Sequence, residues 1–200
     1  MYFHRLLLLF LFLTIQAVCV AQFRFIENKN QWHEKAKFRA EIPNGFLFLE
    51  QAGFTYLFHD PASFPKHHGT HTEGEPASQP LRGHVVKVKL KDAKPNANLT
   101  ASEQLGGAYN FLMGNNREKW GRNARAFGRV AYQQVYEGIS MHFLQEETDL
   151  KYEFRVQPLA NPKKIKLVYE GQEKIYLHNG ELFIKTSVNA MKEERPYCYQ

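Results

Sequence analysis

The sequence predicts an all-β fold, an antiparallel β-sandwich of short strands and hairpins that is incomplete at its C-terminus. Many segments alternate apolar and polar side chains with a period of two, as Val86, Val88 and Leu90 do between lysines. Asn-Gly pairs at 44–45 and 179–180 separate such segments and are typical of tight hairpins. No apolar stripe at helical spacing is long enough to compete with this interpretation.

The first 21 residues predict a secretory signal peptide. A positively charged start, Met1 to Arg5, precedes an apolar run from Leu6 to Leu13. Small residues, Cys19 and Ala21, then occupy the positions that a signal peptidase requires. A membrane-spanning helix is the less favoured interpretation, because polar residues interrupt the apolar run before it reaches about 20 residues. We therefore expect cleavage after Ala21 and export of the remaining chain.

Residues 22–200 are long enough for one domain with a sizeable core. The chain carries a formal net charge of +6, which suits a solvated surface that meets acidic glycans or an anionic envelope. The excess is too small and too scattered to predict nucleic-acid binding. Only Cys198 follows the predicted cleavage site, so we expect packing rather than an internal disulfide to stabilise the domain.

The first half of the domain predicts a hairpin, a third strand, a long loop and a fourth strand. The third strand has Phe54, Tyr56 and Phe58 on one face, and the loop is rich in Pro, His, Gly and Ser. A connection without regular secondary structure is predicted after the fourth strand. The predicted ranges are 37–42 and 46–50 for the hairpin, 54–59 for the third strand, 60–82 for the His-rich surface loop, 86–90 for the fourth strand and 93–104 for the connection.

The second half carries the strongest alternation. One short helical turn is predicted before a series of strands, and the last strand begins near the C-terminus. An edge left unpaired there predicts self-association of residues 22–200 expressed alone. The predicted ranges are 117–122 for the helical turn, 126–136 for a strand, 139–144 with 150–156 for a hairpin, 165–169 for a strand, 175–177 with 182–186 for a second hairpin, and 195–200 for the last strand.

Clustered histidines in the 60–82 loop are candidate metal ligands. His67, His68 and His71 lie between His59 and His84, and imidazole is a ligand for zinc, copper and nickel. Their spacing matches no recognised metal site, so a solvated surface loop is the favoured interpretation. A metal-dependent hydrolase using this loop is the alternative, and we predict no cofactor.

Cationic and aromatic residues near position 120 form a candidate ligand site. Trp120, Arg122 and Arg125, together with Arg129 and Tyr132, have the composition of a patch that binds sugars or polyanions. Buried aromatic rings with solvated arginines are the alternative interpretation. No Gly-x-Ser-x-Gly sequence and no phosphate-binding glycine loop before a helix is present, and we expect no enzymatic activity.

Several segments resemble a known family. The sequence resembles the N-terminal domain of large Bacteroidota surface proteins over nearly the whole predicted mature chain. The resemblance implies a domain of unknown function that precedes β-propeller-like (SBBP) or PKD repeats and a C-terminal signal for type IX secretion or gliding-motility sorting. It supplies no catalytic residues. The segments that carry the resemblance are 25–32, 38–45, 53–56, 109–115, 119–120, 136–139, 150–154 and 195–197.

These observations together predict a non-enzymatic extracellular or cell-surface β module for adhesion, glycan binding or partner binding. We expect it to be the N-terminal part of a larger surface protein, with a glycan, a protein or downstream repeat domains as partners. We expect no nucleic acid partner and no membrane span after signal cleavage. A structural cap that covers the end of a following repeat array is a further alternative.

Overall fold

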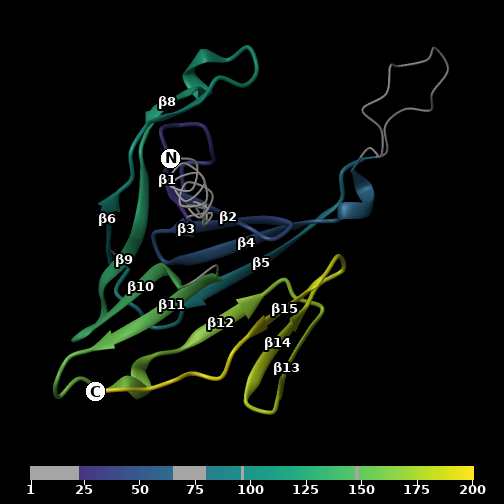
Figure 1. Cartoon of the computed structure of the whole chain (residues 1–200). Coiled ribbons are helices and arrows are strands. Elements are labelled where there is room, and N and C mark those ends of the chain that lie inside the picture. The colour runs from purple at the N-terminus through teal and green to yellow at the C-terminus, as the bar shows by residue number, and fades with distance from the viewer. Residues whose placement is uncertain (1–22, 65–79, 96, 147–148) are drawn as a thin grey trace, which may run out of the picture.

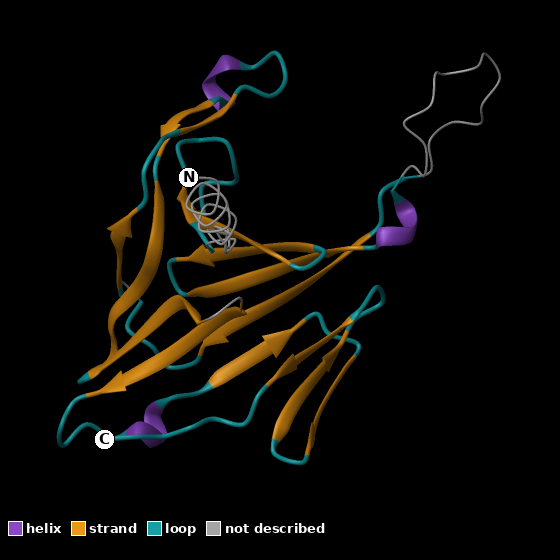
Figure 2. Ribbon diagram, viewed as in Figure 1, coloured by secondary structure: helices purple, strands orange, loops and turns teal. Residues whose placement is uncertain are grey.

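The computed structural model describes residues 23–64, 80–95, 97–146 and 149–200. The predicted signal peptide lies outside these residues, as do His67, His68 and His71. The described chain consists of strands and turns with three single 3₁₀ turns, and every strand pairing is antiparallel (Figure 2). The all-β fold class predicted from the sequence is confirmed. No helix within the described ranges is long and apolar enough to cross a membrane.

Ten strands form one large sheet that curls back on itself (Figure 1). The ring of Phe54 meets Phe143 at a centroid distance of 5.1 Å and Tyr152 at 6.2 Å, which brings distant parts of the sheet face to face. The strands are β1 (Phe25–Glu27), β2 (Ala36–Ile42), β3 (Gly45–Glu50), β4 (Gly53–His59), β5 (Gly83–Leu90), β6 (Asn98–Gln104), β9 (Ala126–Tyr136), β10 (Ile139–Glu146), β11 (Asp149–Val156) and β12 (Leu167–Glu170). Their order is β11-β10-β9-β1-β2-β3-β4-β5-β12, and β6 also pairs with β9.

The core lies inside this curl, between β3–β5 and β9–β11. Its largest fully buried side chains include Tyr132, Phe25 and Leu47. The Tyr132 hydroxyl lies 2.7 Å from the Glu50 carbonyl oxygen and 2.5 Å from that of Gly53, and donates to this pair across the core. Because a buried hydroxyl needs a partner, this contact fixes β9 against the β3–β4 turn.

Two small sheets complete the domain. The strands β13 (Lys174–His178), β14 (Glu181–Lys185) and β15 (Ala190–Glu193) form one of them, and its Ile184 is fully buried in the main core. The Glu193 carboxylate accepts hydrogen bonds from Tyr152 at 2.6 Å and from Tyr169 at 2.8 Å. Burial, followed by the charge of Glu193, raises the pKa of Tyr152, so its hydroxyl stays a donor at neutral pH. These contacts attach the three-stranded sheet to β11 and β12.

The other small sheet is a two-stranded arm of β7 (Tyr109–Phe111) and β8 (Gly121–Ala124). It extends beyond the main sheet on the side away from β13–β15 (Figure 1). The 3₁₀ turn η2 (Arg117–Lys119) lies near its far end, within the helical turn predicted there (Figure 2). The other two 3₁₀ turns are η1 (Pro61–Ser63) and η3 (Pro162–Lys164).

Two predicted elements differ from the structure. Residues 93–104 are not only a connection, because β6 pairs with β9 over most of that range. Only Leu99 and Ala101 of β6 pack against the core, so its sequence shows little alternation. The predicted strand over 195–200 is wrong, since residues 194–200 belong to no strand. Tyr197 and Tyr199 are exposed there and stack on each other at 6.0 Å instead of pairing with a neighbouring strand.

Candidate functional site

A groove with a mixed lining of charged, polar and apolar residues lies along the outer face of β2–β5, on the side of the sheet opposite the core. Its volume is about 820 Å³. The strand register places Thr55 beside Lys87 and Gly53 beside Lys89, so these residues share the outer face. The groove is lined by Glu34, Lys35, Lys37, Glu50, Gln51, Ala52, Gly53, Phe54, Thr55, Lys87, Val88, Lys89, Leu90, Lys91 and Val168.

Five of the residues that line the groove are lysines. Lys89 pairs with Glu170 at 2.7 Å, whereas the other four form no ion pair within the described part of the chain. The Lys37 ammonium donates to the Glu34 carbonyl oxygen at 3.0 Å, which leaves its charge uncompensated. The alternation of β5 points its lysines outward because Val86, Val88 and Leu90 fill the core on the other face.

The floor of the groove is built from close backbone approach and a hydroxyl–carboxylate contact. The Thr55 hydroxyl donates to Glu50 at 2.7 Å, across the β3–β4 hairpin. A Cβ atom at Gly53 would lie 2.3 Å from the Val88 carbonyl oxygen, so only glycine fits where β4 meets β5. The groove therefore offers hydrogen-bond acceptors in its floor and ammonium donors along its sides.

An aromatic–arginine cluster adjoins the groove on the same face. The Arg39 guanidinium lies 4.4 Å from the centre of the Trp32 ring, 4.2 Å from Phe46 and 5.6 Å from Phe111. Arg39 pairs with Phe48 across β2 and β3, and Phe48 pairs with Thr55 of the groove floor. The cluster and the groove are thus neighbours in one row of the sheet.

Burial changes the chemistry of Arg39. Its side chain is only 14% exposed, and burial lowers the pKa of the guanidinium although Glu41, 3.7 Å away, acts against this. Its Nε atom is buried and has no hydrogen-bond partner in the described structure. Cation–π contacts with the surrounding rings take the place of a full set of hydrogen bonds.

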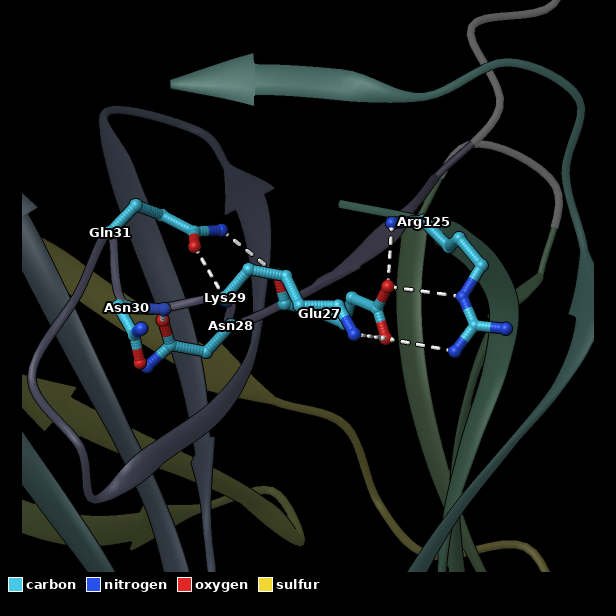
Figure 3. Close-up of polar contacts among 6 residues, drawn as sticks. All are labelled: Glu27, Asn28, Lys29, Asn30, Gln31 and Arg125. Carbon is cyan, nitrogen blue, oxygen red and sulfur yellow. Dashed lines mark hydrogen bonds and ion pairs between the residues drawn. The ribbon is translucent and has the colours of Figure 1, made fainter. Parts of the chain in front are cut away.

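The loop after β1 holds Trp32 in this cluster. The Asn28 amide donates to the carbonyl oxygens of His33 and Ala36 at 3.0 and 2.8 Å, and its side-chain oxygen accepts from the backbone of Asn30 and Trp32. The Gln31 amide donates to the carbonyl oxygen of Glu27, the last residue of β1, at 2.9 Å (Figure 3). This network fixes the loop and with it the Trp32 ring.

Glu27 joins the end of β1 to the junction of β8 and β9, where Arg125 lies. Its carboxylate accepts from the Arg125 backbone N–H at 3.0 Å and from the guanidinium at 3.0 and 3.2 Å (Figure 3). Burial raises the pKa of Glu27, but the hydrogen bonds from Arg125 and the charge of Lys29 lower it by more, so the net pKa lies below 4.5. The carboxylate stays charged at neutral pH, and the two elements stay joined.

The structure brings together only part of the predicted ligand patch. The Trp120 ring lies 5.3 Å from Arg122 and 5.5 Å from Arg117, a residue that the sequence analysis missed. Arg125 points elsewhere because it pairs with Glu27. Tyr132 is fully buried, and Arg129 pairs with Glu103 at 3.1 Å.

The two described histidines at the base of the 60–82 loop do not converge. His84 shares a sheet face with Phe58, and His59 shares the opposite face with Gly83. The His84 ring nitrogens meet the Ser187 hydroxyl at 2.9 Å and the Gly171 carbonyl oxygen at 2.7 Å. No group of three or more potential metal ligands occurs among the residues that the structure describes. The prediction for His67, His68 and His71 remains untested.

Neither the groove nor the aromatic–arginine cluster was predicted as a site. The signal for the groove was the lysine alternation of β5, and the signal for the cluster was Trp32 followed by Arg39 next to an aromatic residue, Phe38. No curated protein and no solved structure matches the chain. A family model described as a domain of unknown function matches residues 25–200, which includes the whole of the groove and the cluster. The chain belongs to this family, the domain of unknown function DUF7948.

Proposed function

We propose that this domain is a non-enzymatic binding module that holds a negatively charged polysaccharide in the lysine-lined groove. The observation that carries the proposal is the convergence of five lysines on one hollow, four of them without a carboxylate partner in the described structure. The lysines outnumber the two acids of the lining, Glu34 and Glu50, and this excess of positive charge attracts an extended anion and raises its local concentration.

The chemistry of the groove favours a sugar chain over a small anion. Thr55 and Glu50 in the floor offer a hydroxyl and a carboxylate to sugar hydroxyl groups, while the lysines along the sides match uronate, sulfate or phosphate substituents. The aromatic rings of the adjoining cluster offer an apolar face next to this polar track.

The predicted leader and the resemblance to Bacteroidota surface proteins support an extracellular setting for this module. In that setting the ligand is an acidic glycan of an envelope or matrix, and binding it serves adhesion. Downstream repeat domains, where the protein continues, present the module away from the cell surface.

Binding of polygalacturonate, compared with neutral dextran, tests the proposal. Replacing Lys35, Lys87 and Lys91 by glutamine should weaken polygalacturonate binding by roughly tenfold. It should also flatten the dependence of binding on salt, because the lost contacts are electrostatic. Dextran binding should be weak in every variant.

A charge-matched control is available on distant surfaces. Lys163, Lys174 and Lys185 are exposed and form no ion pair in the described structure, and replacing them by glutamine removes the same net charge. If this control loses as much affinity as the groove variant, the positive charge of the whole domain is responsible and the groove is not the site. Equal affinity of both variants and the parent would also reject the proposal.

A further inference from the structure

The β7–β8 arm is a projecting structure with its own attachment to the domain. A small apolar cluster separate from the main core surrounds its base, with Ala124 and Ala126 buried and Tyr109 and Phe111 packed against them. Phe111 also meets Trp32 edge-on at 5.3 Å. These contacts fix the base, so the arm carries its tip at a defined position beyond the sheets (Figure 1).

The tip itself is ordered by internal hydrogen bonds. The Trp120 indole N–H donates to the Gly114 carbonyl oxygen at 3.0 Å, which closes the loop between the two strands. The Asn116 side chain accepts from the Glu118 backbone N–H at 3.0 Å and caps η2. A loop that is already ordered loses little conformational entropy when it binds.

Two large apolar side chains project from this ordered tip. Leu112 is 54% exposed and Met113 is 80% exposed. A pair of adjacent exposed apolar side chains on a projecting arm indicates a surface that contacts a membrane or another molecule.

Three cations follow these apolar side chains in the sequence. Arg117, Lys119 and Arg122 are exposed and form no ion pair in the described structure, and Glu118 is the single acid between them. Two of the cations flank the Trp120 ring. The loop between β7 and β8 and the start of β8 therefore carry exposed apolar side chains, an indole ring and cations within one short segment.

We propose that the tip of the β7–β8 arm inserts into the surface of a membrane that contains anionic lipids. Leu112 and Met113 enter the acyl region, Trp120 lies at the headgroup level where indole rings are favoured, and the cations contact lipid phosphates. Charge complementarity favours this occupant. A protein partner fits less well, because a standard interface buries about 800 Å² on each side, and here two side chains supply the exposed apolar surface.

Vesicle flotation tests this inference. The protein should float with vesicles of phosphatidylcholine and phosphatidylglycerol and should bind vesicles of phosphatidylcholine alone more weakly. Replacing Leu112 and Met113 by serine should reduce binding to the anionic vesicles by roughly tenfold or more, because it removes the burial of two apolar side chains. Replacing Arg117 and Arg122 by glutamine should reduce it by a similar factor and abolish the preference for phosphatidylglycerol.

The control variant replaces Leu159 and Leu177 by serine. These leucines are also highly exposed but lie on other parts of the domain, so their replacement should leave vesicle binding unchanged. The groove variant at Lys35, Lys87 and Lys91 separates this inference from the proposed function: it should still float with vesicles, and the arm variants should still bind polygalacturonate. Absence of flotation for the parent protein, or its loss in the groove variant but not in the arm variants, overturns the inference.

Discussion

Asn28 illustrates how much of the local structure depends on single polar side chains. One amide satisfies two carbonyl oxygens and one side-chain oxygen satisfies two backbone N–H groups, so the loop after β1 needs no regular secondary structure. The same loop places Trp32 over Arg39. At the residue scale, the arrangement beside the groove follows from a few side-chain-to-backbone hydrogen bonds.

The Glu27–Arg125 pair gives the first prediction. Replacing Glu27 by glutamine removes a charged acceptor of three hydrogen bonds and should lower the free energy of unfolding at pH 7 by about 1–3 kcal/mol. Because the folded-state pKa of Glu27 lies below its ordinary value of 4.5, the stabilisation is fully present above about pH 4.5 and is lost as the pH falls through the folded-state pKa. Urea unfolding curves at a series of pH values should show the parent and the variant converging in acid. A stability difference that stays constant from pH 7 down to pH 3 would contradict this account.

Residue identity alone predicted some of the site and not the rest. Trp120 and Arg122 are close in sequence and meet in the structure, whereas Arg125 meets a residue almost a hundred positions away. The cluster around Arg39 combines Trp32 with Phe111 from the arm, and no local pattern in the sequence joins such distant positions. Local chemistry was therefore predictable, and contacts that depend on sheet order were not.

At the scale of elements, the two predicted Asn-Gly pairs occupy different positions in their hairpins. At 179–180 both residues have positive φ angles, of 52° and 83°, as the hairpin type requires. At the other hairpin the turn residues are Pro43 and Asn44, with Asn44 at a φ of 56°, and Gly45 is already the first residue of β3. The sequence predicted both hairpins correctly because alternation of apolar residues continues on each side.

Gly45 provides the second prediction. A Cβ atom at this position would lie 2.0 Å from the Leu57 carbonyl oxygen of the neighbouring strand, so β3 and β4 would have to separate locally. Replacing Gly45 by alanine should lower the free energy of unfolding by about 1–3 kcal/mol, as overpacking does. Chemical denaturation measures the change.

Gly106 is the matched control, since no atom lies within 4 Å of its added Cβ and its φ is not positive. Replacing Gly106 by alanine should change the free energy of unfolding by less than about 0.5 kcal/mol. Equal effects at the two glycines would show that chain entropy, rather than steric contact, governs Gly45.

The edge strand β6 shows where element prediction failed. Its outer residues are polar and exposed, because it lies on one side of β9 and only Leu99 and Ala101 reach the core. Strand propensity depends on the neighbours that a strand will have, which a single segment does not reveal. β5 was easier to predict, since its core face is fully buried and its other face lines the groove.

At the scale of the whole molecule, one core joins the curled sheet to the C-terminal sheet. The same buried cluster contains Phe25 near the start of the described chain and Ile184 near its end. The groove strands and the three-stranded sheet are consequently attached to a common interior, whereas the base of the arm packs in the separate small cluster. A sequence predicts alternation within strands, but the order in which ten strands join, and hence which surfaces become neighbours, depends on long-range pairing.

This common core leads to the last prediction, that the domain unfolds as one unit. Ile184 is fully buried, so replacing it by alanine should lower the free energy of unfolding by about 2–4 kcal/mol. Ile175 is its cross-strand partner on β13 and is 38% exposed, and the same replacement there should cost much less. Trp32 and Trp120 are more than 60 positions away from Ile184 in the sequence and report on the groove side and the arm, respectively. If the core is shared, tryptophan fluorescence and β-sheet circular dichroism should shift to lower denaturant together in the Ile184→Ala protein, as a single transition. Two separated transitions, with the fluorescence change unaffected by the substitution, would mean that the C-terminal sheet is an independent unit and that the groove does not depend on it for stability.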